Sequence, residues 1–235
     1  MSIATRQGEV VYEDSDGRRI AENTLQFEWI VTLKGGLEAL FRADPNVFVA
    51  GDLLWYPVEG QPKVRAAPDA MVALGRPKGY RGSYKQWLEG NVAPQVAFEV
   101  LSPGNRPSEM AKKLLFYQRH GVQEYYVYDP DNVTLVGYVR DQLGYFARVP
   151  RMSGHVSPLL GIRFELADEL AVYRADGERF LTYLELVARD EANRLEAERE
   201  RQSAERERQI AAKATAALEA LRARLRAAGI DPDAV

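Results

Sequence analysis

The chain has 235 residues, 46% of them hydrophobic, so it can bury one sizeable core and form one or two domains. Its 31 Lys and Arg residues are outnumbered by 34 Asp and Glu residues, and the net charge of -3 argues against nucleic-acid binding through a global positive field. Because cysteine is absent, disulfides, thiolate zinc sites, iron–sulfur clusters and a cysteine nucleophile are excluded. The N-terminus lacks a basic start followed by an apolar run, and no stretch approaches a membrane-spanning length. We therefore expect a cytoplasmic protein with no membrane partner.

The first 185 residues alternate between helix and strand patterns. Residues 24–42 carry leucine and tryptophan side chains at steps of four, which predicts an amphipathic helix, although Gly35 and Gly36 weaken its middle. A shorter helix is predicted at residues 109–120. Apolar stretches bounded by turn residues predict strands at 46–57, 70–75, 95–101, 124–129, 134–140, 162–166 and 170–174. Because only one helix interrupts these strands, we expect an α/β fold with a mixed (α+β) sheet and few helices.

The C-terminal part of the chain has a different composition. Residues 189–208 are mostly charged, with both signs interspersed, and alanine-rich sequence follows, which predicts a long helix. Pairs such as Asp190 and Arg194, at i,i+4 spacing, each stabilise such a helix by about 0.2–0.5 kcal/mol. We therefore divide the chain into one domain at residues 1–185 and a charged helical extension at residues 186–235.

This extension carries a weak coiled-coil pattern. Leu218, Leu221 and Leu225 alternate steps of three and four, but the equivalent earlier positions are alanines. Two interpretations remain open: a solvated helix held by its own charge pairs, and a helix that self-associates. A homo-oligomer, formed through the core or through this helix, is one expected state of the protein.

Two acidic residues stand out in the predicted strands. Asp69 follows Pro68, which cannot donate to a sheet and usually marks the start of a strand. Glu99 lies inside the next strand, where side chains alternate between the two faces, so it shares a face with Ala97 and Leu101. An ionised carboxylate in such an apolar row costs several kcal/mol unless it has a partner.

The helix predicted at residues 109–120 contains two adjacent lysines with different orientations. Its apolar arc is defined by Met110, Ala111, Leu114, Leu115 and Tyr117. At about 100° per residue, Lys112 falls opposite the centre of this arc, whereas Lys113 lies at its edge beside Tyr117. We expect Lys113 to lean toward the sheet and Lys112 to point into solvent.

Two acids and a lysine in this arrangement indicate a divalent-metal site. Mg²⁺ prefers one or two carboxylates together with water and phosphate oxygens, which is the chemistry of phosphodiester hydrolysis. A lysine ammonium would offset the charge that builds up at phosphorus. The alternative is a structural role, in which Glu99 forms a salt bridge with a Lys or Arg side chain.

Three stretches of the chain, PDAMVALG, VAFEVLSPGNR and KKLLFYQRHGVQEYYVYDP, resemble the Uma2 family (DUF820), which has a restriction-endonuclease-like PD-(D/E)xK fold. The similarity covers roughly residues 20–175. It implies that Asp69 is the first acid of the motif and Glu99 the second. The usual motif lysine would fall at Leu101, but the family pattern K-L-x-x-Y places it in the following helix, at Lys113, with Tyr117 as an accessory residue.

The resemblance implies a Mg²⁺- or Mn²⁺-dependent endonuclease with a nucleic-acid partner, which we expect to be DNA. Asp69 and Glu99 would hold the metal together with the carbonyl of Val100. An acid near the first helix often contributes to such sites, and Glu22 is the candidate for it. The alternative from a different functional class is a non-catalytic nucleic-acid-binding or assembly module that keeps the fold.

Two further features bear on this site. The segment at residues 75–91 interleaves basic and aromatic side chains, a mixture used on phosphates and exposed bases, and its candidates for nucleic-acid binding are Lys78, Arg81, Lys85 and Trp87. An ordinary polar loop is the alternative. Asp52 also precedes an apolar stretch, and it would become a ligand only if the fold brings it near Asp69.

Overall fold

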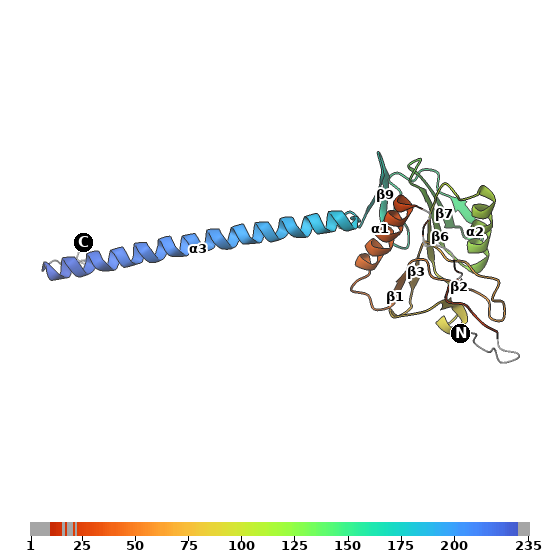
Figure 1. The fold of residues 1–235 in the computed structure, drawn as a ribbon, viewed down its shortest axis with the longest axis horizontal. Helices are drawn as coiled ribbons and strands as arrows, with labels where there is room; N and C mark the ends of the chain where they lie inside the picture. The colour runs from red at the N-terminus through yellow and green to blue at the C-terminus, as the bar shows by residue number, and fades with distance from the viewer. Residues whose placement is uncertain (1–9, 16, 18–20, 22, 230–235) are drawn as a thin grey trace. The chain divides into compact units, whose positions relative to one another are not determined.

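The structure, a computed structural model, describes residues 10–15, 17, 21 and 23–229 (Figure 1). The chain divides into a compact unit that ends at Thr182 and a second unit that begins at Tyr183. Its elements in chain order are α1 (Thr24–Leu40), β1 (Val47–Ala50), β2 (Trp55–Tyr56), β3 (Ala70–Leu74), β4 (Tyr84–Lys85), the 3-10 helix η1 (Gln86–Glu89), β5 (Val96–Val100), α2 (Pro107–His120), β6 (Glu124–Asp129), β7 (Thr134–Arg140), β8 (Phe146–Arg148), β9 (Arg163–Leu166), β10 (Leu170–Tyr173) and α3 (Tyr183–Ala227).

The main sheet has six strands in the order β1-β3-β5-β6-β7-β8. Strands β5 and β6 are parallel, with α2 in the connection between them, and the other neighbours are antiparallel. Two small sheets accompany it, the antiparallel pair β9–β10 and the parallel pair β2–β4. This mixed sheet with few helices confirms the predicted α/β fold class.

The predicted strand at residues 46–57 is wrong as a single element. The chain turns after β1 at Gly51 and Asp52, and Asp52 adopts a left-handed conformation with φ 48°. The following residues form β2, which pairs with β4 rather than with the main sheet. The short elements β4, η1 and β8 were not predicted, because segments of two to four residues carry too little periodicity to recognise.

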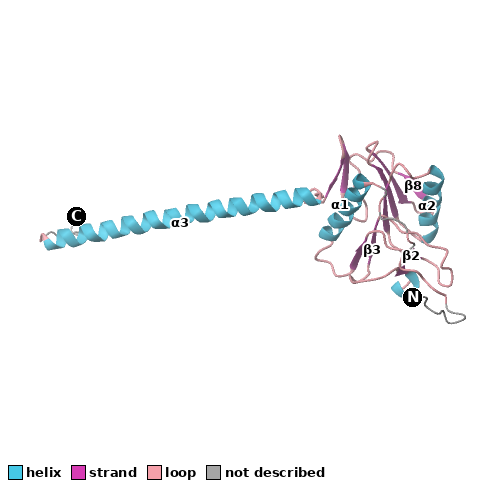
Figure 2. Ribbon diagram, viewed as in Figure 1, coloured by secondary structure: helices cyan, strands magenta, loops and turns pink. Residues whose placement is uncertain are grey.

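The two helices of the first unit cover opposite faces of the sheet (Figure 2). On the α1 face, Ile30, Leu33 and Leu37 belong to the same core cluster as the β5 residues Phe98 and Val100. The α2 face is packed with aromatic and small side chains, among them Trp55, Met71, Ala97, Tyr117 and Tyr125. The alternation along β5 is the predicted one, and it directs Glu99 to the α2 face.

Helix α1 runs through its two glycines without a break. A Cβ atom at Gly36 would overlap the ring of Phe180, which packs against the helix at this position. The close approach of that ring explains a residue that otherwise lowers helix stability by roughly 1 kcal/mol. The side chain of Asn23 caps the helix by accepting a hydrogen bond from the backbone N–H of Gln26 at 2.7 Å.

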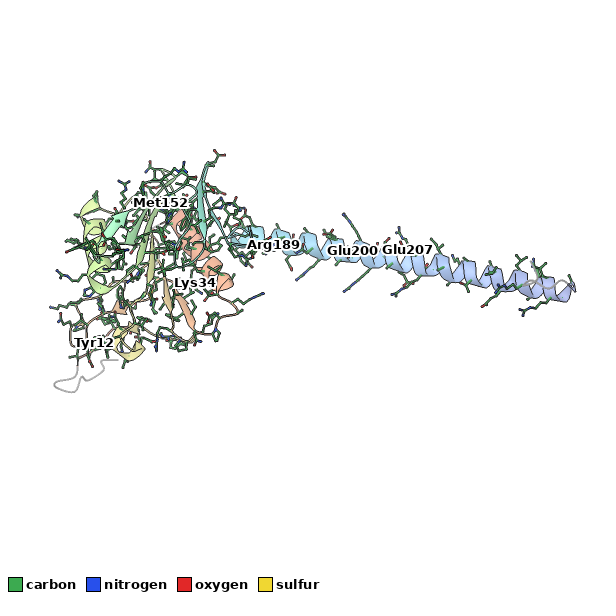
Figure 3. All side chains as sticks on the ribbon, turned by 180° about the vertical axis from the view of Figure 1, so that it is seen from behind. Tyr12, Lys34, Met152, Arg189, Glu200 and Glu207 are labelled. Atoms are coloured by element: carbon green, nitrogen blue, oxygen red, sulfur yellow. The ribbon has the colours of Figure 1, made fainter. Side chains whose placement is uncertain are left out.

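Helix α3 extends over 45 residues and buries none of them. Figure 3 shows Arg189, Glu200 and Glu207 along it. The expected i,i+4 pair between Asp190 and Arg194 is present, with 2.8 Å between carboxylate and guanidinium. Among the described helices, α3 included, none has the length and apolar character needed to cross a membrane.

Removal of α3 beyond its first turns should leave the first unit folded. A chain cut after Ala188 loses a segment with little apolar surface, so it should keep a cooperative unfolding transition in urea or heat, followed by circular dichroism. The control is the full chain under the same conditions. An unfolded product would show that the division near residue 185 lies in the wrong place.

Candidate active site

Asp69 lies at the start of β3, on the α2 face of the sheet. The ladder between β3 and β5 pairs Ala70 with Phe98, so the next position in this antiparallel register sets Asp69 opposite Glu99. The Asp69 side chain is 9% exposed, and its Oδ2 accepts a hydrogen bond from the backbone N–H of Val100 at 2.6 Å. This contact fixes the first acid against the strand that carries the second.

Glu99 is 3% exposed and both of its carboxylate oxygens have partners. The ammonium of Lys113 lies 2.6 Å from Oε2, and the hydroxyl of Tyr117 donates to Oε1 at 2.6 Å. Tyr117 is completely buried, whereas the Lys113 side chain is 34% exposed. Glu99 is therefore half of a salt bridge in this structure, which was one of the two alternatives drawn from the sequence.

Helix α2 places these two partners one turn apart. It begins with Pro107 at its first turn, and residues four apart, such as Lys113 and Tyr117, lie on the same side of it. Lys112 is exposed, as its position on the helix predicts. The predicted apolar arc was wrong for two of its five residues, because Ala111 is exposed and Leu115 is 64% exposed. Tyr117 is the buried residue of the helix, as the arc predicted.

The pKa of Asp69 is raised from 3.8 to about 8. Burial is the largest cause, and the negative charge of Glu99 adds to it; the ammonium of Lys113 and the N–H of Val100 act in the opposite direction without cancelling it. Asp52 contributes a smaller increase of the same sign. Asp69 therefore holds its proton at neutral pH, and once it ionises the site carries two carboxylates against one lysine.

Lys113 and Tyr117 keep their protons. Burial alone would lower the pKa of Lys113, but Glu99 and Asp69 together raise it above its usual value. Burial and the neighbouring carboxylate of Glu99 raise the pKa of Tyr117 well above its usual value. At neutral pH, Lys113 is therefore a cation and Tyr117 a hydrogen-bond donor.

Val100 has a side-chain partner at both of its backbone polar groups. Its N–H donates to Asp69, and its carbonyl oxygen accepts a hydrogen bond at 2.7 Å from the side-chain amide of Gln26, a residue of α1 that is 6% exposed. Sequence reasoning missed Gln26, since a polar residue in the first turn of a helix gives no sign of a contact 74 residues away. A carbonyl oxygen has two lone pairs, so this bond leaves a second position for a cation.

The donor set of the site fits a divalent cation. Asp69 and Glu99 supply hard carboxylate oxygens from facing strand positions, and a cation would neutralise the second negative charge that burial and Glu99 otherwise keep protonated on Asp69. Within the described part of the chain, no three His, Cys, Asp or Glu side chains form a group that could hold a metal. Asp52 is therefore not a third carboxylate ligand, although its backbone N–H bonds the carbonyl of Pro68 at 3.1 Å.

Comparison with known proteins gives the family. The model of the family described as "Uma2: Putative restriction endonuclease" matches residues 7–177. The chain belongs to the Uma2 family. Membership confirms the resemblance drawn from the sequence, and it gives the protein the nuclease-like character of the family and the restriction-endonuclease-like fold class.

A solved structure from the same family is also similar. It is described as a putative nuclease belonging to DUF820 from Anabaena variabilis ATCC 29413, and it covers 59% of this chain and 75% of its own, with 15% sequence identity and a TM-score of 0.43. No curated protein matches the chain.

The resemblance to the Uma2 family also implied roles for residues other than Asp69 and Glu99. Lys113 and Tyr117, the K-L-x-x-Y residues, reach Glu99 from α2, so the lysine occupies the neighbourhood of the second acid although it comes from a different element. Glu22, the candidate acid near the first helix, lies outside the described residues.

The candidate nucleic-acid-binding residues have partners within the chain. Lys78 donates to the carbonyl of Phe41 at 2.6 Å, at the end of α1, and Arg81 forms a 2.6 Å ion pair with Glu89. Lys85 lies over the ring of Tyr12, and the ring of Trp87 is 4.9 Å from the same tyrosine. These contacts give each residue a structural role, and binding to nucleic acid stays a prediction for all four.

Proposed function

We propose that the protein is a Mg²⁺- or Mn²⁺-dependent endonuclease that hydrolyses phosphodiester bonds in DNA. The observation that carries this proposal is the meeting of Asp69 and Glu99 across β3 and β5, with Lys113 bound to Glu99 from α2. Membership of the Uma2 family supports the same class of reaction.

In this proposal the two carboxylates and the Val100 carbonyl hold the cation. A bound Mg²⁺ or Mn²⁺ would polarise a phosphoryl oxygen and lower the pKa of a water molecule beside it. Asp69, whose pKa of about 8 lets it hold a proton at neutral pH, releases that proton when it becomes a ligand. Binding should therefore tighten as pH rises toward 8.

The remaining residues act through position and charge. Lys113 stays positively charged and partly exposed, so its ammonium can contact a phosphate and offset the negative charge that develops at phosphorus. Tyr117 orients the Glu99 carboxylate by donating to Oε1. Gln26 and Asp69 bond the carbonyl and the N–H of Val100, and so restrain the backbone that carries this carbonyl.

One observation favours a second candidate function. Both oxygens of Glu99 are already bonded, by Lys113 and Tyr117, so the same three residues also form a complete structural network. In a non-catalytic nucleic-acid-binding module, this network would serve only to hold α2 against the sheet.

A cleavage assay distinguishes these functions. The full chain is incubated with supercoiled plasmid and with short DNA and RNA oligonucleotides, in Mg²⁺, Mn²⁺ or EDTA, beside the Asp69→Ala variant. The endonuclease should nick or cut DNA with either metal, and neither EDTA samples nor the variant should do so. Retention of the oligonucleotides in a gel without cleavage would instead support the binding module.

A further inference from the structure

Helix α3 exposes apolar side chains along its length. At 1.5 Å per residue its 45 residues span roughly 68 Å, and the exposed ones include Leu184, Leu195, Ile210 and Leu221. Its charge pairs explain why a single helix forms, but they do not explain why leucine and isoleucine recur on it.

These side chains lie on one stripe with a regular spacing. Steps of four, four and three residues, beginning at Leu184, give a period of 11 residues in three turns, which stays close to the natural period of an α-helix. The stripe consists of Leu184, Ala188, Ala192, Leu195, Arg199, Ser203, Arg206, Ile210, Ala214, Ala217, Leu221 and Leu225. Its polar positions are Arg199, Ser203 and Arg206, near the middle of the stripe.

We propose that α3 pairs along this stripe with α3 of a second copy of the chain, in antiparallel orientation. The order of the steps is the same when the stripe is read from either end. In one antiparallel register, every stripe residue therefore faces a stripe residue of the second copy, and Leu184 faces Leu225. In this register two pairs match a large residue with a small one, Ala188 with Leu221 and Leu195 with Ala214, whereas Ala192 faces Ala217. A large residue that faces a small one fills the space between two helices.

The parallel orientation is disfavoured by the same residues. In parallel register each position faces itself, so Arg199 meets Arg199 and Arg206 meets Arg206 at the centre of the stripe. Like charges that face each other are repulsive, and Ala188 or Ala214 facing itself leaves space unfilled.

The charges of the two halves of α3 are complementary. Residues 183–204 contain six acidic and four basic side chains, a net charge of -2, whereas residues 205–227 contain three acidic and six basic side chains, a net charge of +3. Antiparallel pairing brings opposite net charges together at both ends, and parallel pairing brings like charges together. Exposed charges add little affinity, but they set the orientation of helix pairs.

The absence of cysteine makes the orientation testable by cross-linking in the full chain. Ala188→Cys is mixed at equilibrium with Leu221→Cys carrying a larger tag, and a short bismaleimide is added. The antiparallel pair should give a covalent heterodimer, because these positions face each other. Ala188→Cys alone should give almost no dimer, because its two copies would lie roughly 50 Å apart, at 1.5 Å for each of about 33 residues.

A matched control uses the far side of the helix. Ala197→Cys mixed with Thr215→Cys places both thiols away from the stripe, and this mixture should give little product. Light scattering should show the unmodified chain as a dimer. Cross-linking of Ala188→Cys to itself would overturn the antiparallel orientation, and a monomer at all concentrations together with no cross-linked mixture would overturn the pairing itself.

Discussion

Replacement of Lys113 by alanine should lower the rate of DNA cleavage by about 10²- to 10³-fold, the loss typical of removing one group that stabilises charge in the transition state. Lys112→Ala should change the rate by less than about twofold, because Lys112 is exposed on the far side of α2 and does not contact Glu99. The two lysines are adjacent and have the same charge. They therefore make a matched pair, with initial rates of plasmid nicking in Mg²⁺ as the measurement.

The Lys113→Ala variant leaves Glu99 without its cation, so its folding needs a separate control. Melting curves recorded in Mg²⁺ show whether the variant is folded at the assay temperature. A double variant, Lys113→Ala with Glu99→Ala, should be little worse than either single variant, since residues that act as one unit lose function non-additively. Full cleavage by folded Lys113→Ala would contradict the role given to the lysine.

The two acids should respond in opposite ways to loss of charge when EDTA removes the metal. Asp69→Asn keeps an acceptor for the Val100 N–H and removes a carboxylate that is buried beside Glu99, so it should raise the free energy of unfolding. Glu99→Gln leaves the ammonium of Lys113 without its carboxylate partner and should lower the free energy of unfolding by about 3 kcal/mol. This is the lower end of the range for a buried pair, because Lys113 reaches solvent. Urea denaturation of both variants and the wild type in EDTA measures the difference.

The effect of Asp69→Asn should depend on pH with a defined sign. The pKa of Asp69 is raised from 3.8 to about 8 in the folded chain, so between these values the folded state keeps a proton that the unfolded state releases. The contribution of this group to the stability of the wild type is therefore complete below pH 3.8 and is lost as pH rises to about 8, a change on the order of 6 kcal/mol. The gain from Asp69→Asn should be larger at pH 8 than at pH 5.

An exposed acid provides the control for these measurements. Glu59→Gln removes one negative charge from an exposed side chain and should leave the free energy of unfolding within about 0.5 kcal/mol of the wild type at both pH values. Destabilisation by Asp69→Asn in EDTA at pH 8 would show that the Asp69 carboxylate is satisfied without a cation.

Local periodicity is the reason that much of the site could be predicted. Alternation along β5 places Glu99 opposite the α1 face, and the 100° step of a helix distinguishes Lys113 from Lys112; both rules need only a few neighbouring residues. The family motif adds the link between these two elements, which no local pattern contains.

The parts that could not be predicted depend on contacts between distant segments. The hydrogen bond from Gln26 to Val100 requires α1 to lie on one particular face of the sheet, and the packing of Phe180 on Gly36 requires residues from both ends of the first unit to meet. The partners of Lys78 and Arg81 are also set by the tertiary structure. The sequence of a basic loop therefore does not reveal that two of its cations already bond to other groups of the chain.

Titration calorimetry of Mn²⁺ into the metal-free protein at pH 8 measures whether Asp69 and Glu99 together hold a divalent cation, as claimed. The wild type should bind one Mn²⁺ per chain, and Asp69→Asn and Glu99→Gln should each lose most of that affinity while Glu59→Gln retains it. At pH 6 the wild type should bind Mn²⁺ more weakly and should release about one proton on binding. Titrations in buffers with different ionisation enthalpies measure the number of protons released. Equal Mn²⁺ affinity in the wild type and Asp69→Asn would contradict the claim.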